Sequence, residues 1–370
     1  MSILTESLFQ PGLLAGVHIK NRLAVAPMTR VSALEDGCVG PLMTEYYQSY
    51  AEGGFGLIIT EGLYTDKAFS QCYYRQPGIS DAEQAMSWQP IIRGVNKTGA
   101  KIIAQLMHAG GLSQFNGFKG HSAAPSAVRP LGQQMPFYYG EGLYSIPEAM
   151  TVMDIESAIE GFVEAALRAK EAGFDGVELH GANGYLLDQF LTTYTNQRND
   201  EFGGNLENRL RIFQQLILSV RRAVGSAFIL GVRFSQTKVN DTEYRWSEGA
   251  AAAEKTFRLV AECGVDYIHT TEPDMCEPAF EGSDSLAALA RRYSGLPVIA
   301  NGGVQQPEGA AKMLNSDQAD FISLGKAALV NPDWPNRVSK TGQLREFDFA
   351  MLSPLANLQY GSEYLEGLAD

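Results

Sequence analysis

One short segment carries a histidine, an asparagine and a tyrosine whose side chains could act together on a polar oxygen. His180 and Asn183 are separated by two residues, and Tyr185 follows two positions later. His180 and Asn183 can each donate a hydrogen bond without carrying a charge, so the pair could hold and polarise a carbonyl or nitro oxygen. The phenol of Tyr185 carries an exchangeable proton and could act as a general acid. The same spacing also fits two residues that only cap the next helix, with Tyr185 packed beside them.

Two further polar residues, Gln105 and Arg233, lie within or at the end of apolar stretches. The amide of Gln105 offers a donor and an acceptor to the edge of a flat heterocycle, and the guanidinium of Arg233 suits an anion. In the structural alternative, Arg233 pairs with a buried carboxylate such as Glu61 or Glu178. The residue types leave both interpretations open.

Glycines follow two apolar stretches near the end of the chain. Asn301 precedes Gly302 and Gly303, and Gly325 precedes Lys326. Glycine lets backbone N–H groups approach a ligand closely, and the lysine adds a positive charge. We therefore expect a phosphate site at these turns, with ordinary turns and a surface lysine as the alternative.

Histidines and cysteines give little support for a metal site. The chain has five histidines and no His-x-His pair, although His108, His180 and His269 all lie near the ends of apolar stretches. Its four cysteines, at positions 38, 72, 263 and 276, form no Cys-x-x-Cys motif. Because a catalytic metal needs a denser set of ligands, we expect no metal ion and no iron–sulfur cluster.

The scaffold that positions these residues is indicated by recurring short apolar stretches. They read as continuous Val, Ile, Leu and Ala runs, which is typical of strands buried on both faces. The eight runs are residues 23–28, 56–60, 101–106, 176–179, 228–234, 265–269, 297–300 and 320–324.

Helical periodicity appears between the runs. It is strongest from Ile155 to Ala172, where Asp154 can cap the start and Gly173 can end the helix. Weaker helical patterns occupy residues 43–51, 82–96, 206–224, 250–263, 285–293 and 307–314. Eight strands alternating with helices predict an α/β protein with a (β/α)8 TIM barrel. The competing open sheet lacks its signature, because no Gly-x-Gly-x-x-Gly follows the first run.

We expect a single domain over residues 1–370, because no linker-like segment divides the chain. The barrel would span about residues 20–340, with residues 341–370 as a C-terminal cap. The connection after the third strand, residues 107–149, is far longer than the ~4–6 residues of an ordinary loop. It is rich in Gly, Pro, Ser and aromatic residues, so we interpret it as a lid or a ligand-contacting loop.

The composition favours a protein whose partners are small molecules. The 29 basic and 42 acidic residues give a net charge of −13, which disfavours nucleic acid or an anionic membrane as a partner. No apolar run approaches the ~18 residues of a membrane span. The N-terminal sequence shows no secretory signal, so we expect a cytoplasmic protein.

Taken with their neighbours, these residues form a series of motifs. The most specific is Ala172–Leu191, which contains His180, Asn183 and Tyr185. Others occur in order between about residues 8 and 340: Leu8–Pro11, Lys20–Leu23, Ala26–Arg30, Gly56–Gly62, Gln105–His108, Phe202–Arg209, Gly231–Arg233, Ala300–Gly303 and Asn331–Asp333. The series resembles the Old Yellow Enzyme family of flavin-dependent ene-reductases.

The resemblance implies noncovalently bound FMN, with its phosphate on the two glycine-containing turns. It places Gln105 at the pyrimidine edge of the flavin, Arg233 beside N1 and O2, and Thr29 at carbonyl O4. The full set of implied cofactor-binding residues is Pro27, Met28, Thr29, Gly62, Gln105, His180, Arg233, Asn301, Gly302, Gly303, Gly325 and Lys326.

The resemblance also implies a reaction. NAD(P)H would supply a hydride through the flavin to an activated alkene, an α,β-unsaturated carbonyl or nitro compound. His180 and Asn183 would hold the activating oxygen, and Tyr185 would protonate the alkene. Tyr73 and Tyr360 are further substrate-binding candidates and the next candidates for the proton donor.

Three positions depart from the family pattern. Lys326 stands where arginine is usual, Met107 where an aromatic residue is frequent, and Gly111 where arginine is found. A rival hypothesis from another class is a cofactor-free barrel aldolase or isomerase acting on a phosphorylated substrate. It would need a lysine or carboxylate base at the barrel mouth, for which the fourth to sixth strands offer only Glu178.

Overall fold

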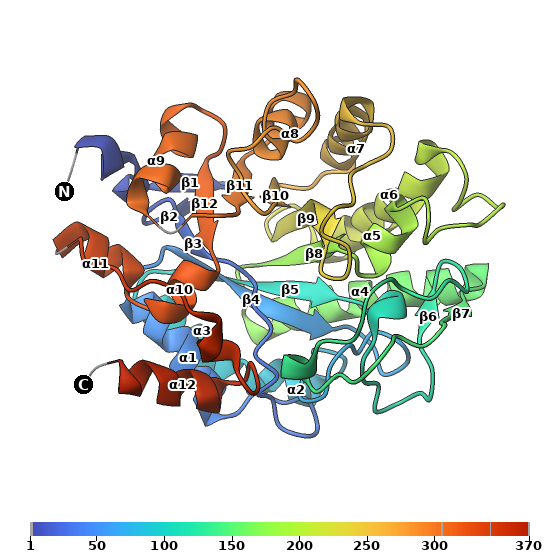
Figure 1. The fold of residues 1–370 in the computed structure, drawn as a ribbon, viewed down its shortest axis with the longest axis horizontal. Helices are drawn as coiled ribbons and strands as arrows, with labels where there is room; N and C mark the ends of the chain where they lie inside the picture. Colours follow the sequence, from blue (N-terminus) through green and yellow to red (C-terminus); the bar gives the residue numbers. More distant parts are fainter. Residues whose placement is uncertain (1–2, 305, 341, 369–370) are drawn as a thin grey trace.

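The strands of the molecule close into a barrel. The computed structural model describes residues 3–304, 306–340 and 342–368. Within these residues, eight parallel strands form one closed barrel whose order follows the chain (Figure 1). They are β3 (Leu23–Val25), β4 (Leu57–Tyr64), β5 (Lys101–Met107), β8 (Gly176–Asn183), β9 (Ile229–Lys238), β10 (Tyr267–Thr271), β11 (Val298–Asn301) and β12 (Phe321–Leu324). Closure through the pairing of β12 with β3 confirms the barrel prediction and excludes the open sheet.

Helices surround the barrel (Figure 1). They are α1 (Pro41–Glu52), α2 (Ala82–Ser87), α3 (Gln89–Lys97), α4 (Val152–Ala172), α5 (Leu186–Leu191), α6 (Leu206–Val224), α7 (Ala250–Glu262), α8 (Leu286–Ser294), α9 (Pro307–Asn315), α10 (Lys326–Val330) and α11 (Trp334–Lys340). All seven predicted helical segments are helical. The prediction of one helix over 82–96 is wrong in one respect, because the helix is interrupted at Trp88 and the segment forms two helices. Pro90 has no N–H to continue the hydrogen-bond ladder of α2, and it opens α3 instead.

The longest helix also begins differently from the prediction. Thr151 is the N-cap of α4, and its hydroxyl accepts a hydrogen bond from the Asp154 N–H. The Thr151 N–H in turn donates to the Asp154 carboxylate, so the two residues form a capping box. Asp154 is therefore the third residue of the helix and not its cap. Gly173 ends α4 as predicted, with φ of 100° in the left-handed region.

The N-terminal end of the barrel is filled with apolar side chains. The hairpin of β1 (Gly12–Leu14) and β2 (Val17–Ile19) contributes Leu14 and Ile19 to a buried cluster inside this end. The barrel strands supply its other members: Ala24, Leu57, Ile59, Ile103, Ile229, Tyr267, Ile299 and Phe321. A ligand site must therefore lie toward the opposite end of the barrel, where the strands finish.

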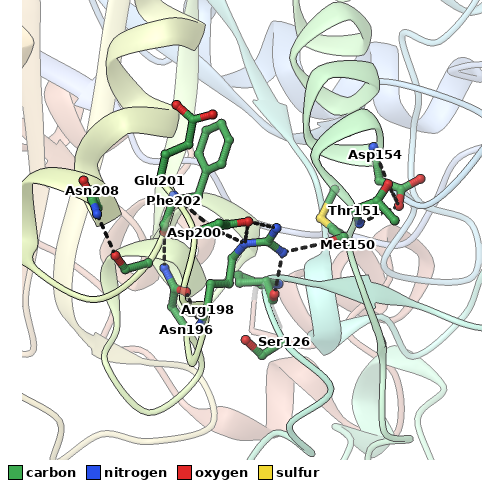
Figure 2. A network of polar contacts seen from close by, with 12 residues as sticks. Ser126, Met150, Thr151, Asp154, Asn196, Arg198, Asp200, Glu201, Phe202 and Asn208 are labelled. Atoms are coloured by element: carbon green, nitrogen blue, oxygen red, sulfur yellow. Dashed lines mark hydrogen bonds and ion pairs between the residues drawn. The ribbon is translucent and has the colours of Figure 1, made fainter.

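The long connection after β5 packs against the segment that follows β8. It holds two short 3-10 helices, η2 (Gly110–Leu112) and η3 (Pro136–Tyr138), and the paired strands β6 (Ala123–Ala124) and β7 (Glu148–Ala149). Arg198 joins the two excursions, because its guanidinium donates to the carbonyls of Pro125 and Met150 and pairs with Asp200 (Figure 2). The loop is thus fixed at its base.

The C-terminal segment crosses the end of the barrel at which the strands finish. It contains η4 (Phe349–Leu352) and α12 (Leu358–Gly367). The Ala356 N–H donates to Phe137 O of the long loop, and Arg30 donates to Asn357 O. This segment occupies the place expected of a cap, although residues 341 and 369–370 lie outside the described part of the chain. The extent of a single domain over 1–370 stays a prediction.

Candidate active site

A pocket of about 700 Å³ opens where the barrel strands end. Its wall contains all of the predicted cofactor- and substrate-binding residues except Tyr73 and Tyr360. The predicted residues that line it are Pro27, Met28, Thr29, Gly62, Gln105, His180, Asn183, Tyr185, Arg233, Asn301, Gly302, Gly303, Gly325 and Lys326.

One end of the pocket is formed by the turns after β11 and β12. Gly302 and Gly303 have φ of 143° and 68°. Only glycine adopts the φ of Gly302 without strain. A Cβ atom on Gly302 would lie 2.1 Å from the backbone oxygen of Glu272. Lys326 is exposed at this end, with its Nζ 4.6 Å from the centre of the Phe349 ring. Two glycines and one lysine therefore lie together at this end of the pocket.

Arg233 supplies a buried positive charge to the wall. Burial lowers the pKa of Arg233 to about 10, so the guanidinium stays charged at neutral pH. Its Nη2 donates to Asn301 Oδ1 at 3.2 Å, whereas its Nε has no hydrogen-bond partner. None of the ion pairs among the described residues joins Arg233 to Glu61 or Glu178. The arginine is thus left with donor capacity toward the pocket.

Glu178 lies inside the barrel, outside the pocket wall, in a saturated network. It accepts hydrogen bonds from Gln105 Nε2 at 2.8 Å and from the Tyr267 hydroxyl at 2.9 Å, and it lies 2.9 Å from His269 Nδ1. Burial alone would raise the pKa of Glu178, but His269 and Arg233 lower it to about 2. The carboxylate is therefore ionised and committed to holding Gln105 and His269.

The predicted oxygen-binding pair lies at the end of β8. His180 is buried, and its Nδ1 has no hydrogen-bond partner. Burial, reinforced by the charge of Arg233, lowers the pKa of His180 to about 3, so the imidazole is neutral at neutral pH. Asn183 is half-buried with φ of 61°, a left-handed conformation held by a bond from its N–H to Ser235 Oγ at 2.8 Å. Two uncharged donors therefore share one wall.

Tyr185 stands beside the histidine, with 4.9 Å between the two ring centres. Its hydroxyl lies 2.6 Å from that of Tyr73, which is buried behind it and does not line the pocket. Burial holds the pKa of both phenols well above the usual value. Tyr185 therefore keeps its proton at neutral pH.

Tyr360, which was predicted to bind the substrate, and His108, which was considered as a metal ligand, both lie away from the pocket. Tyr360 is half-buried on α12, where its N–H is bound by the N-cap Asn357, and Phe349 and Leu352 take the lining positions of this segment. His108 is buried, and its Nδ1 accepts the Gly110 N–H at 3.1 Å. The structure brings neither side chain to the pocket.

Several residues that line the pocket were not predicted from the sequence. Glu272 lies in the wall, and burial raises its pKa to about 7. Phe137 and Tyr138 come from the long loop, whose aromatic content already suggested contact with a ligand. The remaining additions are Ala26, Arg30, Met107, Met135, Val239, Thr242, Pro273, Val304, Ser323, Leu324, Leu329, Phe349 and Leu352.

The described residues contain neither a cluster of metal ligands nor a membrane-spanning helix. In residues 3–304, 306–340 and 342–368, no group of three or more His, Cys, Asp or Glu side chains could hold a metal ion. Over the same ranges, no helix has the length and apolar character needed to cross a membrane.

Comparison with known proteins agrees with the geometry. Residues 7–344 match the model of the NADH:flavin oxidoreductase / NADH oxidase family. The chain is 34% identical over 339 residues to putative 12-oxophytodienoate reductase 6 of Oryza sativa subsp. japonica, covering 90% of this chain and 83% of that protein. It is 32% identical over 354 residues to the NADH oxidase of Thermoanaerobacter brockii. That match covers 92% of this chain but 52% of the relative, so the chain spans about half the relative's length.

A solved structure shows the same architecture. The Old Yellow Enzyme homologue from Zymomonas mobilis superimposes with a TM-score of 0.83 at 29% sequence identity, over 96% of this chain and 99% of that one. The family match covers nearly the whole barrel, and the structural match covers its strands, helices and excursions. The chain belongs to the Old Yellow Enzyme group of the NADH:flavin oxidoreductase / NADH oxidase family.

Proposed function

We propose that this protein is an FMN-dependent ene-reductase that uses NAD(P)H to reduce the C=C bond of α,β-unsaturated carbonyl or nitro compounds. The observation that carries the proposal is the group of three uncharged donors, His180, Asn183 and Tyr185, on the wall of a pocket that also holds a buried arginine. This arrangement suits a substrate whose oxygen gains negative charge during the reaction.

The pocket fits a flavin mononucleotide. One buried nitrogen atom on its wall, Arg233 Nε, has no partner within the protein and is available to the acceptor-rich edge of a flavin. Gly302, Gly303 and Gly325 line the end of the pocket where Lys326 adds a cation, so backbone and a positive charge together could receive a phosphate. When bound, FMN would accept hydride from the reduced nicotinamide and return it to the alkene.

His180 and Asn183 would hold the substrate's activating oxygen. Both residues are positioned before the substrate binds, because His180 is buried and the backbone of Asn183 is held by Ser235. Stabilising charge on such an oxygen with one preorganised donor is worth ~10²–10³ in rate. Because the imidazole is neutral, it would act as a hydrogen-bond donor and not as an acid.

Tyr185 would deliver the proton to the alkene carbon next to the activating group. Its phenol is protonated at neutral pH, and the Tyr73 hydroxyl 2.6 Å away can stabilise the phenolate that is left. Phe137 and Tyr138 of the long loop form part of the wall and would limit the access of water.

The rival aldolase or isomerase finds less support. Glu178, its only base foreseen from the sequence, is ionised within a saturated network inside the barrel. Glu272 is a carboxylate in the wall, but the family match favours flavin chemistry. The cytoplasmic location stays a prediction.

The test is to purify the protein and measure bound flavin by its visible absorbance. Anaerobic consumption of 2-cyclohexenone would then be followed with NADH and with NADPH. A yellow protein that forms cyclohexanone supports the proposal. A colourless protein that gains neither a flavin band nor turnover after FMN is added would refute it.

A further inference from the structure

A buried lysine–aspartate pair lies next to the turn that joins Asn183 to Tyr185. Lys238 Nζ contacts both carboxylate oxygens of Asp188, at 2.7 and 2.8 Å, and also donates to Gln236 O at 3.1 Å. The Lys238 and Asp188 side chains are 2% and 0% exposed. Neither lines the pocket, and the proposed reaction uses neither.

The pair is connected to the turn through Gly184. The Gly184 N–H donates to Asp188 Oδ2 at 2.6 Å, and Gln189 Nε2 donates to Gly184 O at 2.7 Å. Both polar backbone groups between Asn183 and Tyr185 are therefore held by side chains of α5. The fit is close, because a Cβ atom on Gly184 would lie 3.3 Å from Lys238 Cβ.

Lys238 also faces the turn from the neighbouring strand. In the β8–β9 pairing, Asn183 and Lys238 are direct partners, and the N–H of the next residue, Val239, donates to Asn183 O at 3.1 Å. Asn183 and Gly184 both have positive φ, at 61° and 88°. A non-glycine residue keeps such a backbone conformation only where the surroundings hold it.

The electrostatics of the pair explain why both members are needed. Burial raises the pKa of Asp188 and lowers that of Lys238, and the charge of each partner opposes the shift of the other. The ring of Tyr244 lies 4.3 Å from Lys238 Nζ and adds a cation–π contact. An ionised carboxylate is a stronger acceptor for a backbone N–H than a neutral one. Without Lys238, the short bond to Gly184 would be weakened.

We propose that Lys238 and Asp188 are positioning residues for alkene reduction. By keeping an ionised carboxylate on the Gly184 N–H, they fix the turn from which Asn183 holds the substrate oxygen and Tyr185 delivers the proton. The inference rests on the proposed function. The expected loss of rate follows from geometry, since a displacement of about 1 Å in a reacting group can slow the reaction ~10²-fold.

The experiment compares Asp188→Asn, Lys238→Met and the double variant with the wild-type protein. Lys101→Met is the matched control, because Lys101 pairs with Asp175 at 2.9 Å at the opposite end of β8. Each FMN-loaded protein is examined for thermal unfolding, for flavin content, and for the rate at which 2-cyclohexenone reoxidises the reduced enzyme. Hydrogen exchange of the peptide that contains Gly184 gives a readout independent of catalysis.

We expect Asp188→Asn and Lys238→Met to exchange faster at this peptide and to slow the enone step by up to ~100-fold. Lys101→Met should lose stability without either effect. A single variant leaves one buried charge unpaired, so the double variant should recover stability. Its enone step should stay slow, because the ionised acceptor is gone.

The inference is overturned if enone rates follow thermal stability across all the variants, or if the double variant regains the wild-type rate. Unchanged exchange at the Gly184 peptide in Asp188→Asn would overturn it as well. Failure of the proposed function looks different, because the wild-type protein would then reduce no enone while the exchange result would still report on the turn.

Discussion

The hydroxyl pair of Tyr185 and Tyr73 yields a prediction that separates catalysis from stability. Tyr185→Phe removes the proposed proton donor and leaves the hydroxyl of Tyr73, a residue that is 1% exposed, without the partner it has at 2.6 Å. Loss of a general acid is worth ~10²–10⁴ in rate. Burying one unsatisfied hydroxyl costs ~1–3 kcal/mol of folding free energy. Both effects should therefore be measurable in the same variant.

Tyr73→Phe should behave differently. It keeps the proton donor and removes one hydrogen bond worth ~0.5–1.5 kcal/mol, so the enone step should slow only about 2- to 12-fold. Tyr73→Phe with Tyr185→Phe removes both hydroxyls. That double variant should regain most of the lost stability while remaining as slow as Tyr185→Phe, because no hydroxyl is left buried alone.

The assay is stopped-flow spectroscopy of the two half-reactions, together with chemical denaturation at saturating FMN. Flavin reduction by NAD(P)H should change little in Tyr185→Phe, whereas reoxidation by 2-cyclohexenone should slow. A nitroalkene should be affected less, because its nitronate is stable enough to take a proton from water. A Tyr185→Phe variant that is slow in the NAD(P)H step and normal in the enone step would refute the assignment.

Three other perturbations test the pocket. His180→Ala and Asn183→Ala should each lower enone turnover by ~10²–10³ while flavin content changes little; normal enone kinetics in either variant would remove that residue from the proposed oxygen site. Lys326→Ala should weaken FMN retention, measured by flavin fluorescence on dilution, more than Lys326→Arg, because alanine cannot neutralise a phosphate; equal retention would remove Lys326 from the site. The pKa of about 3 for His180 predicts that folding stability is lost as pH falls from about 6.5 toward 3, because only the unfolded chain takes up that proton. Against His180→Gln, the wild-type protein should therefore lose more stability between pH 7 and pH 4, and equal losses would show an ordinary pKa.

The barrel and its strand ends were predictable because of how parallel strands are buried. Strands covered on both faces are continuous apolar runs, and the rule that sites lie at their C-terminal ends selects residues without knowledge of the reaction. His180 and Asn183 lie in the C-terminal half of β8, and Arg233 lies beside His180 in the middle of β9. Their predicted positions on one pocket wall were therefore within reach of the sequence.

Contributions from distant segments were not predictable in this way. Phe349 lies in the pocket wall and stacks on Lys326, yet it is 64% exposed and belongs to a segment with little periodicity. Tyr360 was expected at the substrate, but the cap made by Asn357 and its contact with Arg30 set the position of α12. Such placements depend on contacts more than 300 residues apart, as in the bond from Arg30 to Asn357.

The Lys238–Asp188 pair shows a further limit of sequence patterns. Asp188 lies inside the most specific motif, but nothing near it reveals that its partner is at the end of the next strand. Parallel pairing of β8 with β9 brings the two residues together. Only the register of the barrel discloses that contact.

The central claim is that hydride reaches one alkene carbon and a proton, delivered by Tyr185, reaches the other. The most direct measurement is the position of deuterium in the product of 2-cyclohexenone reduction, run once with deuterated NAD(P)H in water and once with NAD(P)H in D2O. We predict cyclohexanone with nucleotide deuterium at Cβ and solvent deuterium at Cα, and with the Cα label formed more slowly in Tyr185→Phe. Deuterium on the carbonyl carbon, in an alcohol that keeps its double bond, would contradict the account.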